Sequence, residues 1–233
     1  MCGLCKTKEN YFGRSRKMKK LIPLTVLITL CLFCAEAKAG LTYSFVNITN
    51  NDPVNAAIGQ AQLFVELGDP VANQVTFTFS NTGPVASSIT QVYFDDGGLL
   101  SFASLDDSLA GVEFSQGANP PELPGGNTVS PPFTTTAGLS FGSDPPVQAN
   151  GVNPGQWLAI TFDIDPLNDL QEQIALGALR IGIHAQAIGA GGSEAFILGG
   201  PVDATATIPA PGAIVLAGIG AGVLSLLRRH RVF

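Results

Sequence analysis

The stretch WLAITFDI, Trp157 to Ile164, decides the fold, because large apolar side chains occupy every second position. In a β-strand this alternation puts apolar and polar side chains on opposite faces. A second stretch, LRIGIH at 179–184, repeats the pattern with Arg180 and His184 on the polar face. Both stretches are predicted to be half-buried strands. Their inward sets are Leu158, Ile160, Phe162 and Ile164, and Leu179, Ile181 and Ile183.

Other short apolar runs lie on both sides of these two, separated by Gly, Pro, Asn and Asp. They fall at 41–48, 61–67, 75–79, 89–94, 112–115, 195–198 and 202–208. Many short strands with turn residues between them, without alternating helices, are typical of all-β domains. We predict a single β-sandwich over residues 40–208, with a jelly roll as the alternative.

One short helix interrupts the strands. Leu167, Leu170 and Ile174 have helical spacing, and Asn168 with Gln171 has the form of a capping box. Residues 119–155 contain eight prolines and many glycines, which predicts a long surface loop with one strand pair around 133–141.

The positions of the cysteines and the net charge of the domain exclude several classes of function. All four cysteines precede Gly40, so the domain has neither disulfides nor a catalytic thiol, and a zinc site is disfavoured. Sixteen acidic residues between 52 and 203 face one basic residue, Arg180, a formal net charge of −15. Such a domain repels nucleic acid, and Arg180 is expected to pair with a carboxylate.

The N-terminal segment has the pattern of a secretory signal peptide at 18–39. Lys19 and Lys20 precede an apolar run from 21 to 33, and Ala37-Lys38-Ala39 forms a cleavage site before Gly40. Residues 1–17 are interpreted as a mis-called extension upstream of the true start, Met18. The alternative is an extended basic n-region.

The C-terminal segment, 209–233, is predicted to contain a proline-rich break, an apolar helix and a basic end, in that order. Pro209-Ala210-Pro211-Gly212 precedes an uncharged run from 213 to 227, and Arg228, Arg229 and Arg231 follow it. Basic residues stay on the cytoplasmic side of a membrane, so the domain before them should face outward. Fifteen helical residues reach about 22 Å, less than the ~30 Å hydrocarbon core, which favours transient retention in the inner membrane.

This tail resembles the PEP-CTERM sorting signal, with Pro209 and Pro211 as the motif prolines and Ala210 where the name-giving motif has glutamate. The resemblance implies export and processing by a membrane protease of the exosortase type. Residues 75–198 also resemble uncharacterised domains that precede such tails, through Asp95-Asp96-Gly97, Ala149-Asn150-Gly151-Val152 and 179–184. That second resemblance implies kinship without a known activity.

Two kinds of ligand site can be considered. Asp163, Asp165 and Asp169 lie at a strand end and in the following loop, where oxygen ligands would suit Ca²⁺, although Asp is also an ordinary turn residue. No other cofactor is expected. Trp157, Tyr93 and Tyr43 are candidate sugar platforms, with core packing as the alternative.

A serine hydrolase is the third possibility. Gly138-Leu139-Ser140-Phe141-Gly142 fits Gly-x-Ser-x-Gly, and an aspartate (Asp163 or Asp165) and His184 follow in hydrolase order. Pro145-Pro146 follows, however, and cannot continue the helix that a nucleophile elbow requires.

The sequence therefore predicts a non-catalytic protein with a structural or adhesive role at the cell surface or in the extracellular matrix. Its expected partners are the Sec export machinery, an exosortase-type protease and exopolysaccharide, with no nucleic acid among them. The alternative is a secreted carbohydrate- or Ca²⁺-binding module, and the third is a secreted hydrolase.

Overall fold

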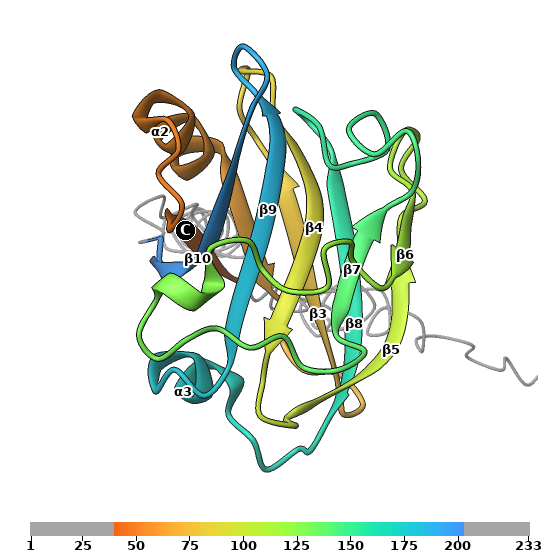
Figure 1. Ribbon diagram of the computed structural model, residues 1–233. Helices are drawn as coiled ribbons and strands as arrows, with labels where there is room; N and C mark the ends of the chain where they lie inside the picture. The colour runs from red at the N-terminus through yellow and green to blue at the C-terminus, as the bar shows by residue number, and fades with distance from the viewer. Residues whose placement is uncertain (1–39, 203–233) are drawn as a thin grey trace, which may run out of the picture. The chain divides into compact units, whose positions relative to one another are not determined.

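The computed structural model describes residues 40–202, which form an all-β domain and confirm the predicted fold class (Figure 1). Ten antiparallel strands make one nearly closed sheet in the order β5-β8-β3-β2-β1-β10-β9-β4-β7-β6. The strands are β1 (Leu41–Asn47), β2 (Leu63–Leu67), β3 (Gln74–Asn81), β4 (Ser88–Asp95), β5 (Leu100–Asp106), β6 (Phe114–Gln116), β7 (Ser140–Ser143), β8 (Trp157–Ile164), β9 (Arg180–Ile188) and β10 (Gly192–Pro201).

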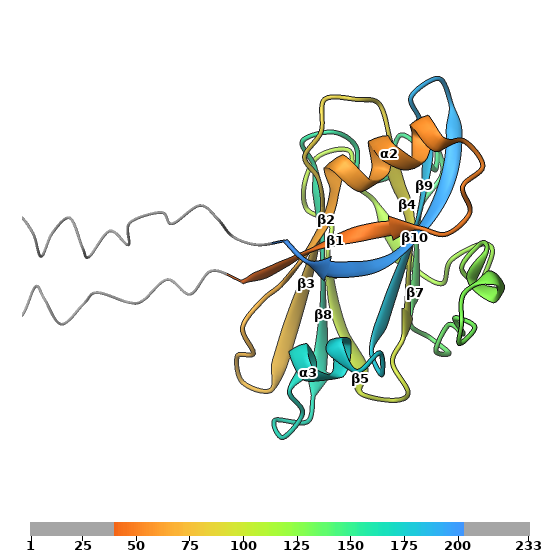
Figure 2. The ribbon, with the colours of Figure 1, turned by 90° about the vertical axis from the view of Figure 1, so that its left-hand side faces the viewer.

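The sheet folds over its own core as a sandwich. Strands β2, β3, β8 and β5 form one wall, and β9, β4, β7 and β6 form the other. Figure 2 shows β1 and β10 running side by side across the gap between these walls. The pairing of β1 with β10 therefore joins the two halves into one sheet.

Phenylalanines from both walls fill the centre of the core. Phe94 on β4 lies 4.8 Å from Phe162 on β8 and 5.4 Å from Phe77 on β3, measured between ring centroids, each pair edge to face. Such aromatic pairs contribute about 0.5–1.5 kcal/mol each beyond the burial of their area. The whole cluster comprises Phe77, Phe79, Phe94, Phe102, Phe141 and Phe162.

A long proline-rich segment, residues 117–139, crosses the outer face of β9 and β4, and we call it the strap (Figure 1). It contains a 3-10 turn, η1 (Gly126–Thr128), and buries Leu123 and Phe133 against Tyr93 and Ala195. A Cβ at Gly182 would lie 2.6 Å from Leu123, so glycine at this position of β9 leaves room for the strap.

The strand pair predicted around 133–141 is wrong in part, because only β7 is a strand there. Strand β4 and side chains together satisfy the backbone just before it. The Thr136 N–H donates to the Phe94 carbonyl, and the Leu139 carbonyl accepts from the Phe94 N–H. Asp95 accepts a hydrogen bond from the Thr134 N–H, and Glu122 accepts one from Thr135. These side-chain contacts and the two backbone bonds to Phe94 hold the segment on the sheet without forming a further strand.

Helix α2 (Pro53–Gln62) was not predicted, and it takes the first two residues of the run at 61–67. The Asp52 side chain caps it by accepting hydrogen bonds from the Val54 and Asn55 N–H groups, and Pro53 opens its first turn. Gly59 lets the helix approach the ring of Phe196 closely. The helix thus covers the core beside the paired strands β1 and β10.

Helix α3 (Leu170–Ala175) is close to the prediction, but its N-cap is Asp169 rather than Asn168. Strand β5 was missed because the run LSFASLD carries small polar residues on its outer side. The run at 202–208, the predicted signal helix and the predicted C-terminal helix fall outside the described residues, apart from Val202.

The phenylalanine cluster makes a direct prediction about stability. Phe94→Ala should lower the free energy of unfolding by about 3–5 kcal/mol, because it leaves a cavity between the two walls. Urea denaturation of the chain measures this loss. Phe64→Ala is the matched control, since Phe64 is only partly buried and lies outside the core cluster. Equal losses for the two variants would contradict a core centred on Phe94.

Candidate functional site

The two ends of the domain lie side by side. Tyr43 near the start of β1 pairs with Pro201 at the end of β10, and the Val202 N–H donates to the Thr42 carbonyl at 2.8 Å. The chain therefore enters and leaves the sheet at one place. Of the predicted processing residues, Gly40 is the first that the structure describes.

Gly40 packs closely against β2. A Cβ at this position would lie 2.9 Å from the Leu67 carbonyl oxygen, so a larger residue would require β2 to shift. The remaining predicted processing residues are Ala37, Ala39, Pro209, Ala210, Pro211, Gly212, Arg228, Arg229 and Arg231, and they lie outside the described residues. Within residues 40–202, no helix has the length and apolar character needed to cross a bilayer.

The three aspartates considered for Ca²⁺ do not form a site. Asp163 accepts a hydrogen bond from the Gln74 amide, Asp165 accepts one from the Leu167 N–H, and Asp169 caps α3. Across residues 40–202, no group of three or more His, Cys, Asp or Glu side chains is placed to hold a metal ion. Each of the three carboxylates is accounted for by a local hydrogen bond.

The other aspartate pairs also organise turns. Asp96 is fully buried between β4 and β5, where it accepts hydrogen bonds from the Gly98 and Leu100 N–H groups and from the Thr136 hydroxyl. Asp107 accepts one from the Phe114 N–H, which fixes the start of β6. These acids are used by the fold itself.

The residues in hydrolase order are not brought together. Ser140 and His184 lie on β7 and β9, on either side of β4, so their strands are about 10 Å apart. The Ser140 hydroxyl accepts from the Ala118 N–H, and His184 Nδ1 pairs with Gln91. Asp163 is exposed on β8, in the opposite wall of the sandwich. No triad can form in this arrangement.

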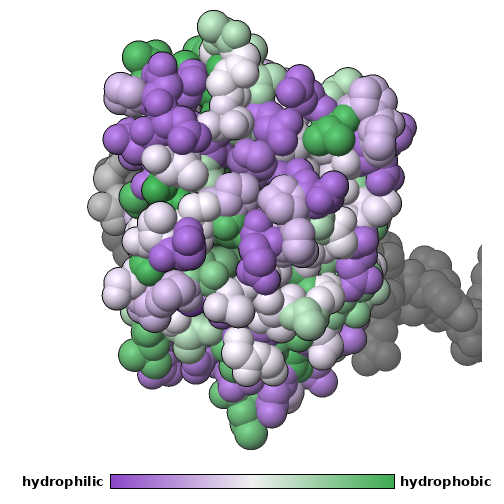
Figure 3. All heavy atoms as spheres, viewed as in Figure 1, coloured by the Kyte–Doolittle hydropathy of each residue, from purple (hydrophilic) through white to green (hydrophobic). Residues whose placement is uncertain are grey.

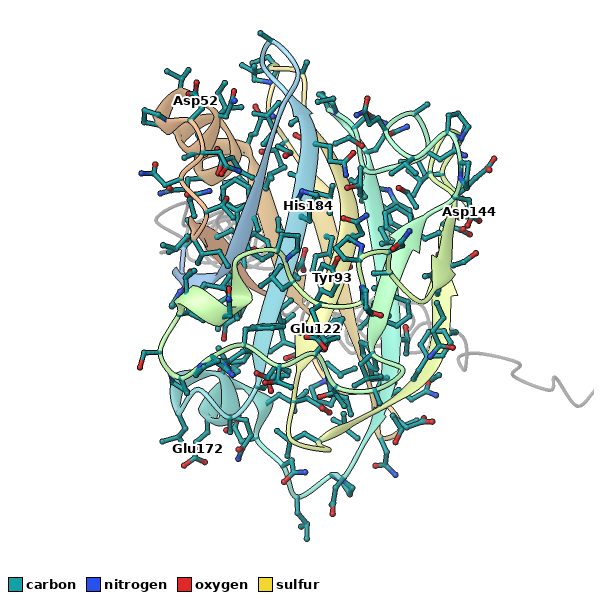
Figure 4. All side chains as sticks on the ribbon, viewed as in Figure 1. Asp52, Tyr93, Glu122, Asp144, Glu172 and His184 are labelled. Atoms are coloured by element: carbon teal, nitrogen blue, oxygen red, sulfur yellow. The ribbon has the colours of Figure 1, made fainter. Side chains whose placement is uncertain are left out.

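The aromatic residues considered for sugar binding pack instead of forming a platform. Tyr93 is fully buried under the strap, where its hydroxyl donates to the Pro120 carbonyl at 2.9 Å. Burial, with a smaller effect of nearby Glu122, raises the pKa of Tyr93 (Figure 4). Tyr43 is buried on β1, and Trp157 is half-buried at the start of β8. These three side chains present no shared face.

Arg180 anchors the strap. Its guanidinium forms an ion pair with Asp95, donates to the carbonyls of Pro131 and Pro132 at 2.7 Å, and lies over the ring of Phe133. The predicted carboxylate partner is confirmed, and the only basic residue of the described domain is thereby engaged internally. Lysine could not make this planar set of contacts.

Glu194 on β10 is the centre of a buried hydrogen-bond network that was not predicted from the sequence. Its side chain is 1% exposed and accepts hydrogen bonds from the Asn51 and Asp52 N–H groups at 3.0 and 2.7 Å. Asn47 and Thr49 also donate to it. The signal available in the sequence was the cluster of donors in Asn47-Ile48-Thr49-Asn50-Asn51. Glu194 therefore holds the loop that leads into α2.

Two further pKa values follow from this packing. Burial lowers the pKa of His184, an effect that Glu194 partly offsets, so the imidazole is neutral near pH 7. Burial, together with Asp169, raises the pKa of Tyr43. Figure 4 shows His184 above Tyr93 on the outer face of β9 and β4. Both tyrosines therefore stay neutral near pH 7.

Hollows on the surface of residues 40–202 could admit a small ligand. One of about 500 Å³ lies between α2 and the loop at 82–85, and it is lined by Val54, Ala57, Ile58, Ala61, Gln62, Thr82, Gly83, Pro84 and Val85. No lining residue is charged or has a nucleophile beside a base. Figure 3 shows hydrophobic residues scattered over the visible face rather than gathered in one patch. The hollow has no catalytic chemistry.

In comparisons with known proteins, no family model, no curated protein and no solved structure matches this chain.

The Glu194 network predicts a pH-dependent contribution to stability. Burial alone would raise the pKa of Glu194, but the hydrogen bonds from Thr49, Asp52, Asn51 and Asn47 outweigh it and lower that pKa. A group with a lowered folded pKa stabilises the fold above its unfolded pKa, about 4.3, and loses that contribution as the pH falls through the folded value.

Glu194→Gln should therefore cost about 1–3 kcal/mol at pH 7, because the amide NH₂ would face backbone N–H donors. The difference from the unchanged chain should shrink toward pH 3, as measured by denaturant unfolding at each pH. Glu66→Gln, at an exposed position on β2, is the control and should change little. A pH-independent loss for Glu194→Gln would argue against an ionised carboxylate in the network.

Proposed function

We propose that this chain is an exported bacterial protein of the cell surface or extracellular matrix, with a non-catalytic structural or adhesive role. Its signal peptide would direct it through the Sec machinery, and its tail would hold it transiently in the inner membrane. An exosortase-type protease would then process the tail. The released domain would then lie in a layer of exopolysaccharide.

The observation that carries the proposal is the single place where the chain enters and leaves the domain. Thr42 and Val202 are hydrogen-bonded neighbours, so the segments that precede Gly40 and follow Val202 both begin at the same end of the sandwich. Cleavage before Gly40 and after residue 208 would cut no strand of the described sheet. The domain could thus be tethered, processed and released without unfolding.

Two other properties of the domain support the same proposal. Its core closes through phenylalanine packing and contains no cysteine, so folding after export needs no disulfide formation. Many of its carboxylates and its single histidine are held in structural hydrogen bonds, and the described residues assemble neither a hydrolase triad nor a metal site. These features suit a durable module better than a catalyst.

The tail can be tested by removing its positive charge. In the full chain expressed in its host, Arg228→Gln, Arg229→Gln and Arg231→Gln together should abolish the membrane-bound precursor, because no basic cluster would then hold the tail at the cytoplasmic side. Pulse labelling followed by fractionation measures this precursor. The unchanged chain should show a membrane form that converts to a shorter form outside the membrane.

The matched control removes three basic residues from the other end, as Arg14→Gln, Arg16→Gln and Lys17→Gln. These positions precede Met18 and should not affect tail processing. Identical membrane retention and shortening in the tail variant and the unchanged chain would contradict the proposed sorting function.

A further inference from the structure

Strand β5 is an open edge of the sheet. It pairs with β8 on one side, and on its other side no strand of residues 40–202 pairs with it. Figure 1 shows β5 at the margin of the fold, below β6. At seven residues it is longer than the other edge strand, β6, which has three. Its side chains at 101, 103, 104 and 106 are exposed.

Natural proteins usually protect such edges with lysine, proline or very short strands. The sequence of β5, LSFASLD, contains no lysine and no proline. Its one protective feature is a bulge between Phe102 and Ser104, which interrupts the register with β8. The bulge leaves two short segments, each with free backbone groups on the outer side, so an added strand would pair with one segment at a time.

The inward side chains of β5 determine which residues an added strand would carry. Leu100 is buried, whereas Phe102 and Leu105 are only partly buried and form the rim of the core. A strand added beside β5 would place every second side chain against this rim. Apolar residues at alternate positions would therefore cover Phe102 and Leu105.

The outward side chains determine the charge of that strand. Asp106 lies at one end of β5, and Asp163 lies opposite Ser101 at the other end. The only basic side chain of the described domain, Arg180, is engaged with Asp95. Two copies of this acidic domain, each with a formal net charge of −15 over residues 52–203, would repel one another, which disfavours a second copy as the occupant.

We propose that the β5 edge is a docking site for an extended segment of a basic partner protein, in which apolar residues alternate with lysine or arginine. The segment would add to the sheet by backbone hydrogen bonding, with its apolar side chains over Phe102 and Leu105. One of its basic side chains would lie beside Asp106, and Asp163 on β8 would attract the others across the width of β5. This interaction is independent of how the tail is processed.

The test uses two synthetic peptides with the same apolar pattern, KVKVKVKVK and EVEVEVEVE, added to the purified full chain. The lysine peptide should slow amide hydrogen exchange by about tenfold or more at those N–H groups of residues 101–106 that point away from β8, because these groups become hydrogen-bonded. The glutamate peptide should leave these rates unchanged. The protection should weaken with added salt, since the charged contacts are exposed.

Charge reversal supplies the matched variants. Asp106→Lys with Asp163→Lys should lose protection by the lysine peptide and gain it from the glutamate peptide. Asp69→Lys with Glu172→Lys changes the net charge equally at exposed positions off β5, and it should behave like the unchanged chain.

Three results would overturn the proposal. One is protection by the lysine peptide that falls outside β5 or is absent. Another is protection of β5 in the free chain that grows with protein concentration, which would identify a second copy as the occupant. The third is concentration-independent protection, in the free chain, of the β5 N–H groups that point away from β8, which would mean that the chain's own flanking segments cover this edge.

Discussion

The pairing of β1 with β10 is the constraint on which the rest of the structure depends. It joins the first and last strands of the domain, and without it the sheet would separate into two five-stranded halves. The same pairing brings the walls close enough for Phe94 to meet Phe77 and Phe162. It also places Thr42 beside Val202, so one contact closes the core and sets the point from which both flanking segments leave.

The buried charged side chains also hold the fold together. The buried acids, Asp96 and Glu194, hold turns and loops through backbone N–H groups, and Arg180 fastens the strap across the outer face. These polar groups thus fix irregular segments onto the sheet. Most of the other carboxylates are exposed, where their negative charge repels anionic molecules.

The fold class could be predicted because alternation marks strands directly, as in 157–164 and 179–184, and both became central strands. Helix α2 was not predicted because its buried face is made of Ala56, Gly59 and Gln62, which give no apolar periodicity. Strand β5 was not predicted because it is an edge strand, largely exposed and polar on one side, and its sequence shows little apolar alternation. Asp163, Asp165 and Asp169 were close in sequence, yet their separate hydrogen bonds could not be foreseen from spacing. Glu194 gathers donors more than 140 positions away, beyond the reach of any local pattern.

The central claim is that a domain with adjacent ends is exported and then released from its tail. The intact mass of the protein recovered from membrane and external fractions of its own host tests this most directly. The account predicts an external species that begins at Gly40 and ends before Ala213, with any excess mass marking a covalent attachment. A species that ends at Phe233 and stays in the membrane fraction would contradict it, because the tail would then be only an anchor.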